Sequence, residues 1–242
     1  MYAYRACRRA WRDRKCGGIL VWQINDCWPT TSWAIVDYYR RKKPAYYSTG
    51  RMIKPLAIGV SRAHHSWTQC HARPPKKLPF DVWVSSSLLQ TVTADVEVRF
   101  VSVRTGEEIK GKVVKRNVNV SANSSTPIMT GEIDYTVDEP YCVAVTLTSR
   151  GQIVSRDVDW PQPFKYLSFE CRGVEVRIMG DTLLVRVARP VKGLCFELED
   201  GINPSDNCID VMPGDDQTIH LTGAGENFAG PVAWQYLGQE QS

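Results

Sequence analysis

The stretch Gly17-Gly18-Ile19-Leu20-Val21-Trp22-Gln23-Ile24-Asn25-Asp26-Cys27-Trp28-Pro29 decides how this chain is interpreted. Four consecutive apolar residues follow a Gly-Gly break and precede an Asn-Asp turn, a pattern that predicts a fully buried strand. In barrels of parallel strands, the active site lies at the C-terminal ends of the strands. We therefore expect this strand to deliver polar and aromatic side chains to a binding site.

Helices are predicted on both sides of this strand. Small and apolar residues recur with helical spacing over residues 2–14, and Gly17-Gly18 is a natural end for that helix. After the strand, Ser32 predicts the N-cap of a helix over residues 32–39. Pro44 predicts the first residue of a further helix over residues 44–53.

A parallel strand between helices needs a neighbouring strand on each side to satisfy its backbone donors and acceptors. The first 54 residues offer no second strand of this kind. Since residues 2–14 open directly with a helical pattern, we expect Met1 to be an internal position of a longer protein. No apolar segment with a cleavage site follows Met1, so no signal peptide is predicted.

Several segments carry a resemblance to a known family. They are Val21-Trp22-Gln23-Ile24-Asn25-Asp26-Cys27-Trp28-Pro29, Ser32-Trp33-Ala34-Ile35-Val36-Asp37-Tyr38-Tyr39 and Lys43-Pro44-Ala45-Tyr46-Tyr47. Together they resemble the last barrel strand and helix of β-mannosidases of glycoside hydrolase family 2, in particular the fungal intracellular type. Near the other end, Ser205-Asp206-Asn207-Cys208-Ile209-Asp210-Val211-Met212-Pro213-Gly214 resembles a segment of the last domain of those enzymes.

From about residue 55 the apolar pattern changes to strict alternation. Between residues 92 and 100 every second side chain is apolar, and strand-like runs recur at 113–120, 133–137, 141–148 and 152–158. This spacing is typical of an immunoglobulin-like β-sandwich. The two prolines of Asp159-Trp160-Pro161-Gln162-Pro163 cannot continue a central strand and predict a boundary. Beyond it, alternation on both sides of Gly180-Asp181 predicts a hairpin in a second sandwich.

We therefore predict a mostly β protein with three parts. Residues 1–54 are the C-terminal remnant of a (β/α)8 catalytic barrel, that is, the last βα unit of a TIM barrel, as the resemblance implies. Residues 55–160 form an immunoglobulin-like β-sandwich, and residues 161–242 form a second, smaller β-sandwich.

Charge is distributed unevenly along the chain. Residues 1–77 contain 16 Lys and Arg but only three acidic residues, whereas the remainder is acidic. We interpret the basic cluster as the solvated face of the first helix, because no nucleic-acid motif accompanies it. No apolar run is long enough to span a bilayer. Neither a nucleic-acid partner nor a membrane is therefore expected.

The eight cysteines are scattered and include no Cys-x-x-Cys pair. Cys142 and Cys195 lie in strand patterns and are interpreted as small buried hydrophobes. Cys70 and His71, near His64 and His65, give a weak hint of a metal site, but their spacing is irregular, so we predict no metal and no cofactor. This usage and the resemblance favour a reducing, intracellular setting, the cytoplasm.

Glycoside hydrolysis needs two carboxyl groups, and in the family both are glutamates on earlier barrel strands. This chain has no glutamate before Glu97, so we expect it to contain no catalytic residue. The resemblance assigns Trp22 to a platform for a pyranose ring, whose apolar face packs on an indole. Asn25 and Asp26 are candidates for binding sugar hydroxyls, or else for shaping the turn. Trp28, Trp33, Tyr38 and Tyr39 are interpreted as packing residues.

The resemblance implies the C-terminal part of an exo-β-mannosidase, which releases terminal non-reducing β-D-mannose with retention from an oligosaccharide or an N-glycan core. Its partner would be the missing N-terminal barrel portion. The isolated chain is predicted to be inactive, because both carboxylates are absent. The alternative is a carbohydrate- or protein-binding β-sandwich module without catalysis, which a line of exposed aromatic residues would favour; Trp67, Trp83 and Trp160 are scattered in the sequence.

Overall fold

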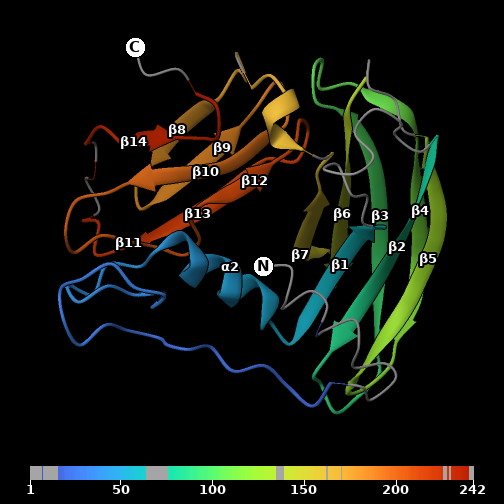
Figure 1. Cartoon of the computed structure of the whole chain (residues 1–242), viewed down its shortest axis with the longest axis horizontal. Coiled ribbons are helices and arrows are strands. Elements are labelled where there is room, and N and C mark those ends of the chain that lie inside the picture. The colour runs from blue at the N-terminus through green and yellow to red at the C-terminus, as the bar shows by residue number, and fades with distance from the viewer. Residues whose placement is uncertain are drawn as a thin grey trace.

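The structure is a computed structural model (Figure 1). It describes Cys7 and residues 16–63, 76–134, 139–161, 163–169, 171–225, 228 and 230–239. The helix predicted over residues 2–14, apart from Cys7, lies outside the described residues. The His64, His65, Cys70 and His71 group and Trp67 lie outside them as well.

Two facing sheets form the first sandwich, the part of Figure 1 coloured from blue-green through green to dark yellow. One sheet has the order β1-β2-β5, and the other has the order β4-β3-β6-β7, with every neighbouring pair antiparallel. The bounds are β1 (Leu56–Arg62), β2 (Lys77–Ser86), β3 (Val92–Ser102), β4 (Glu108–Val120), β5 (Ser124–Asp134), β6 (Tyr141–Ser149) and β7 (Gln152–Asp159).

The core of this sandwich follows from the alternation seen in the sequence. In β3 the apolar side chains of Ala94, Val96, Val98 and Phe100 point inward, where they meet Val143, Val145 and Leu147 of β6 and the inner faces of β1 and β2. The strand predicted over residues 92–100 is confirmed. A β-sheet with one wet face and one buried face produces this pattern.

The second sandwich is smaller and is also built from two sheets. Their orders are β12-β10-β14 and β11-β13-β9-β8. The bounds are β8 (Glu175–Met179), β9 (Thr182–Arg186), β10 (Val191–Glu197), β11 (Asn203–Pro204), β12 (Ile209–Val211), β13 (Gln217–Thr222) and β14 (Ala233–Gln235), and a 3-10 turn, η2 (Phe164–Tyr166), precedes them. The predicted hairpin is confirmed: β8 pairs with β9 across Gly180, whose φ of +61° suits glycine.

A buried seam joins the two sandwiches. Its apolar members come from both sides: Val103, Cys142, Ala144, Val158, Trp160, Phe169 and Met212. The Trp160 indole N–H donates to the Asp210 carboxylate at 2.7 Å, and the buried Arg172 guanidinium donates to the carbonyl oxygens of Val103 and Ser168. The polar groups in the seam are therefore paired across it, as burial requires.

Helix α2 (Pro44–Met52) confirms the predicted helix at this position, with proline at its first position. It lies below the second sandwich and leads into β1 of the first (Figure 1). Tyr47 and Met52 are its buried residues, so it packs with one face.

Two predictions for the residues before α2 are wrong. Residues 17–26 form no strand beyond an isolated bridge at Asn25, and residues 32–39 form no helix. The side chain of Leu20, expected to be buried, is 96% exposed. A parallel strand needs a neighbouring strand on each side to pair its backbone groups. The described residues provide no parallel strands that could pair with residues 17–26 and cover them. The barrel βα unit is therefore not visible in the described part of the chain.

Candidate functional site

The segment with the predicted sugar-binding residues folds into a loop held by backbone hydrogen bonds. Val36 N donates to the Ile24 carbonyl at 2.8 Å, and Asp26 N donates to the Val36 carbonyl at 3.2 Å. These bonds set Asn25 parallel to Val36 in a single bridge. Lys43, just before α2, closes the loop by donating its N–H to the Ile35 carbonyl at 2.9 Å. We call residues 22–36 the site loop.

The three predicted residues lie together at the start of the site loop but differ in exposure. The Trp22 side chain is 76% exposed, and the peptide bond that joins it to Gln23 is cis. Asn25 is exposed, and its amide donates to the Asp26 carbonyl at 3.4 Å. An exposed indole beside an exposed amide offers an apolar face and a hydrogen-bonding group, the combination that sugar recognition uses.

Asp26 is 6% exposed, and its carboxylate is fully engaged within the protein. One oxygen accepts from the Ser32 hydroxyl and the other from the Lys43 ammonium at 3.5 Å. The Ser32 hydroxyl also accepts from Ala34 N at 3.0 Å. Asp26 therefore stabilises the site loop through its contacts with Ser32 and Lys43, whereas Trp22 and Asn25 are the groups exposed to solvent.

The aromatic residues that were interpreted as packing residues in this region are exposed instead. Trp28, Trp33, Tyr38 and Tyr39 all have large accessible surfaces. The interpretation is wrong for this chain, since the elements that would have buried them, a barrel strand and its helix, do not form here. Elsewhere Trp83 and Trp160 are buried, so they form no aromatic line on a sandwich face.

A cavity of about 920 Å³ lies between this segment, α2 and the second sandwich. One wall is apolar and is formed by Ile19, Leu20, Val21, Ile24, Ile35 and Ile53. Arg51, Asp206 and Gln217 add polar groups. Large apolar side chains thus line a volume that nothing in the described part of the chain fills.

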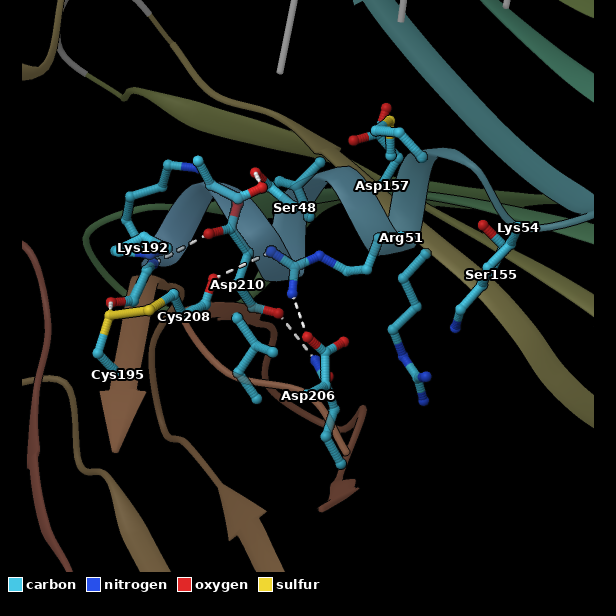
Figure 2. Close-up of a pocket in the computed structure, with 18 of the residues that line it drawn as sticks. Ser48, Arg51, Lys54, Ser155, Asp157, Lys192, Cys195, Asp206, Cys208 and Asp210 are labelled. Atoms are coloured by element: carbon cyan, nitrogen blue, oxygen red, sulfur yellow. Dashed lines mark hydrogen bonds and ion pairs between the residues drawn. A yellow bond between two sulfur atoms is a disulfide. The ribbon is translucent and has the colours of Figure 1, made fainter. Parts of the chain in front are cut away.

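A second cavity, of about 380 Å³, lies where α2 meets both sandwiches (Figure 2). Most of its charged side chains have hydrogen-bonding partners within the junction. Arg156 binds Asp215 through two hydrogen bonds of 2.7 and 2.8 Å, and Lys192 binds Asp210 at 2.7 Å. The Asp157 carboxylate accepts from Val60 N at 3.0 Å. These charges are therefore used to hold the junction together.

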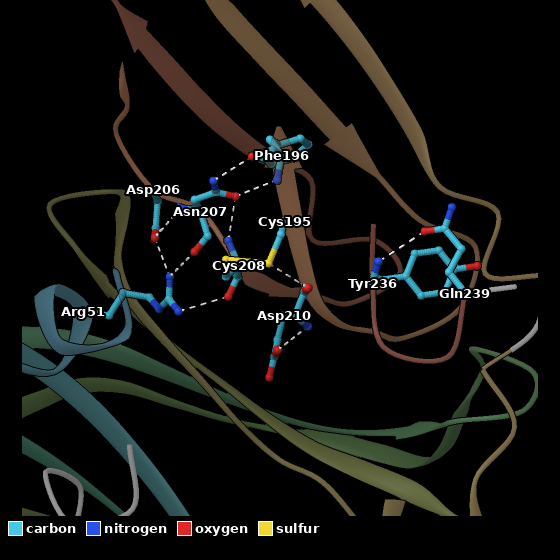
Figure 3. Close-up of a disulfide and its surroundings, with 10 residues drawn as sticks. Arg51, Cys195, Phe196, Asp206, Asn207, Cys208, Asp210, Tyr236 and Gln239 are labelled. Atoms are coloured by element: carbon cyan, nitrogen blue, oxygen red, sulfur yellow. Dashed lines mark hydrogen bonds and ion pairs between the residues drawn. A yellow bond between two sulfur atoms is a disulfide. The ribbon is translucent and has the colours of Figure 1, made fainter. Parts of the chain in front are cut away.

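A disulfide bond joins Cys195 in β10 to Cys208 just before β12 (Figure 3). It corrects the interpretation of Cys195 as a small buried hydrophobe. Cys142, by contrast, is fully buried in the seam, and burial raises the pKa of its thiol well above the usual range. The pairing register offers the missing signal: Leu194 opposes Ile209, so Cys195 and Cys208 are the next opposed pair.

Four glutamates in or near the strands of the first sandwich are occupied in local contacts. Glu97 pairs with Lys112 at 2.9 Å, and Glu108 pairs with Arg99 at 2.7 Å, both on the β3–β4 surface. Glu132 pairs with Lys77, and Glu139 accepts from Ser102. Among the described residues no group of three or more His, Cys, Asp or Glu is placed to hold a metal ion. Within the same residues no helix is long and apolar enough to cross a membrane.

Comparison with known proteins gives the family. A domain model described as a Mannosidase Ig/CBM-like domain matches residues 79–166, which cover most of the first sandwich. The chain is 49% identical over 245 residues to beta-mannosidase B of Emericella nidulans, and 48% identical over 247 residues to that of Aspergillus clavatus. Each alignment covers 99% of this chain and 29% of the relative.

Solved structures share the fold over nearly the whole chain. The β-D-mannosidase of Dictyoglomus thermophilum superimposes with a TM-score of 0.72 at 22% identity, covering 98% of this chain and 28% of that one. An exo-chitosanase of Amycolatopsis orientalis superimposes with a TM-score of 0.70 at 16% identity, covering 96% of this chain and 32% of that one. At these identities the similarity concerns the fold alone.

Fold and sequence together define the class: the chain is homologous to glycoside hydrolases of the family 2 type. In particular, it is homologous over almost its whole length to the C-terminal region of beta-mannosidase B. The chain spans about 29% of the length of these curated relatives. The predicted resemblance is thus confirmed.

Proposed function

We propose that this chain serves as the C-terminal part of an exo-β-mannosidase. In that role it supplies one side of the sugar site and the accessory sandwiches, while a preceding barrel portion supplies the two catalytic glutamates. The substrate would be a β-mannoside oligosaccharide or the core of an N-glycan. The single observation that carries this proposal is the identity of 46–49% to beta-mannosidase B proteins along 99% of the chain.

The apolar surface of the N-terminal segment supports the proposal. Ile19, Leu20 and Ile24 line one wall of the large cavity, and several aromatic residues nearby are exposed. Soluble proteins rarely leave contiguous apolar surface of this kind uncovered. A barrel portion docked on this segment would cover it and would give residues 17–26 the strand neighbours they lack. We propose residues 1–54, 55–160 and 161–242 as the corresponding division into domains.

A graft tests the proposal. This chain would replace the matching 245-residue region of the Emericella nidulans enzyme, and hydrolysis of an aryl β-mannoside would be followed, with the anomeric configuration of the product read by NMR. We expect the chimera to be active with retention and the isolated chain to be inactive. A folded chimera without activity would contradict the proposed function, and turnover by the isolated chain would contradict the assignment of both glutamates to the missing portion.

The same chimera tests the predicted site residue. Trp22→Ala should lower kcat/KM by about tenfold or more, the effect of losing an aromatic surface under a sugar ring. Trp28→Ala is the matched control, because Trp28 is similarly exposed but lies outside the proposed contact. Equal losses in the two variants would remove Trp22 from the sugar site.

The alternative, a binding module without catalysis, has no line of exposed aromatic residues to support it in the described sandwiches. Binding of mannose oligosaccharides to the isolated chain, measured by calorimetry, would favour it over the enzyme reading. The intracellular, cytoplasmic location stays a prediction, and the Cys195–Cys208 bond removes its argument from cysteine usage. Fractionation of cells that express the natural protein decides it.

A further inference from the structure

The Ser205-Asp206-Asn207 motif, noticed in the sequence without a role, binds helix α2. Arg51, in the last turn of α2, donates to the Asp206 carboxylate, to the Asn207 carbonyl at 3.0 Å and to the Cys208 carbonyl at 3.2 Å (Figure 3). Three acceptors from consecutive residues thus surround one guanidinium, whose planar fork suits such a set. We call residues 203–208 the receptor loop.

Two more side chains from the α2 region reach the receptor loop. Tyr47, one turn before Arg51, is buried on the side of α2 that faces Asn207, and burial raises the pKa of its hydroxyl. Lys42, ahead of the helix, donates to the Asn203 side chain at 3.1 Å. The receptor loop therefore holds α2 through Arg51 in its last turn and holds the residues just before the helix through Lys42.

The receptor loop is itself held in shape by the sandwich. The Asn207 side chain accepts from Phe196 N at 2.7 Å and donates to the Phe196 carbonyl at 3.0 Å, as a neighbouring strand would. Cys208 is fixed by the disulfide to Cys195. Ser205 exchanges hydrogen bonds with the His220 backbone on β13, at 2.7 and 3.0 Å. Contacts within the second sandwich thus hold the acceptors for Arg51 in place independently of α2.

The opposite end of α2 holds the site loop. Lys43, the residue that precedes the first turn, binds the Asp26 carboxylate at 3.5 Å and the Ser32 carbonyl at 3.3 Å through its ammonium. Its backbone N–H binds the Ile35 carbonyl. A nine-residue helix is about 13 Å long, so α2 joins the Arg51 contact at one end to the Lys43 contacts at the other. Lys42, which is bridged to Val36 and donates to Asn203, connects the two loops as well.

We propose that Asp206 and Asn207 are positioning residues: through Arg51 they fix α2, and α2 fixes the site loop that presents Trp22 and Asn25. The second sandwich then determines the position of the side chains that the site loop presents. The part of this inference that concerns sugar binding rests on the proposed function. The structural coupling between the receptor loop and the site loop does not depend on that function.

Hydrogen–deuterium exchange on the whole chain tests the link. Asp206→Asn should speed exchange of residues 44–52 and also of the site-loop amides of Asp26 and Val36, by about tenfold, the scale of one charge-assisted hydrogen bond. Asp216→Asn is the matched control, because Asp216 pairs with Arg186 on the surface of the same sandwich. It should leave both regions unchanged.

Arg51→Met is the second variant, since Asp206 also accepts from Asn207 N at 2.8 Å and its change could disturb the receptor loop. It should reproduce the faster exchange, and the double variant should be no faster than Arg51→Met alone, because both act through one contact. The proposal is overturned if α2 loosens while the site-loop amides keep their rate. It is equally overturned if those amides already exchange freely in the unaltered chain.

In the chimera, Arg51→Met should raise KM for an aryl β-mannoside by about tenfold while changing kcat less, as expected for a misplaced binding surface. Asp216→Asn should change neither. A fall of kcat by about tenfold in Arg51→Met, with KM unchanged, would contradict a positioning role. If the unaltered chimera is inactive, the proposed function fails, and the exchange experiment alone decides the link between the two loops.

Discussion

The N-terminal segment of residues 16–43 and the first sandwich are both rich in apolar residues, but they use them differently. In the sandwich, apolar side chains alternate along strands that pair with each other, so one face is buried completely. In the segment, the apolar residues are consecutive, and Leu20 and Ile24 stand in solvent. Consecutive apolar residues suit a strand covered on both faces, which requires neighbours that the described chain does not supply. Burial therefore depends on the available partners as much as on the sequence.

The largest expected effect is a difference in the loss of stability between alanine variants of two leucines. Leu147→Ala, at a position with no exposed surface in β6, should lower the free energy of unfolding by about 3 kcal/mol. Leu20→Ala should change it by less than about 0.5 kcal/mol, because nothing is packed around this side chain. Chemical unfolding followed by circular dichroism measures both. A comparable loss at Leu20 would mean that the segment is part of the folded core.

A smaller effect is expected at two glycines of the sandwich strands. A Cβ at Gly59 would overlap the buried indole of Trp83, so Gly59→Ala should destabilise the protein by about 2 kcal/mol. Gly111→Ala, at a strand position with nothing within 4 Å, should stay within about 0.5 kcal/mol of the unaltered chain. Thermal unfolding of the pair checks this. Equal values would show that the β1–β2 contact is looser than described.

The uncovered surface of the segment should be visible to an apolar fluorescent dye. Leu20→Ser combined with Ile24→Ser should remove a large part of the bound dye signal without changing the melting temperature. Leu89→Ser is the matched control, because Leu89 is an exposed leucine in the loop between β2 and β3. An undiminished signal in the double variant would place the apolar surface elsewhere.

The smallest effect concerns two thiols. The Cys7 side chain lies 3.0 Å from the sulfur of Cys16, and this hydrogen bond lowers the pKa of the Cys16 thiol. A lowered pKa means more thiolate at a given pH, so Cys16 should react with iodoacetamide at lower pH than in a Cys7→Ala variant. Cys142 should stay unmodified between about pH 6 and 8, because burial raises its pKa. Peptide mass spectrometry reads both, and an unchanged profile at Cys16 in Cys7→Ala would contradict the contact.

The sequence was sufficient wherever a pattern could be satisfied within the chain. The alternation at residues 92–100, the hairpin around Gly180 and the helix begun by Pro44 all appear as predicted, because each depends on local periodicity and turn chemistry. Strand β1 and most of β5 were not predicted, because β1 is buried over four consecutive residues and most described residues of β5 are partly or fully exposed, so neither strand shows an alternating apolar pattern.

The site was predictable only in part, for a similar reason. The resemblance selected Trp22, Asn25 and Asp26, and the structure gathers them at one end of a loop. That Asp26 binds Lys43, and that Cys195 opposes Cys208, depends on the pairing of distant backbone segments. Such register cannot be read from composition or spacing. The contacts of Arg51 and Lys42 with residues more than 150 positions away are the extreme cases.

The seam between the sandwiches has a consequence for how this part of the protein melts. Trp160 and Phe169 are covered jointly by residues of both halves, and the Asp210 carboxylate holds the Trp160 indole from the far side. Separating the halves would therefore expose two large aromatic rings and deprive the buried Arg172 guanidinium of its Val103 acceptor. Heat should consequently melt the two sandwiches in one cooperative transition, and either sandwich produced alone should expose its share of these rings to solvent.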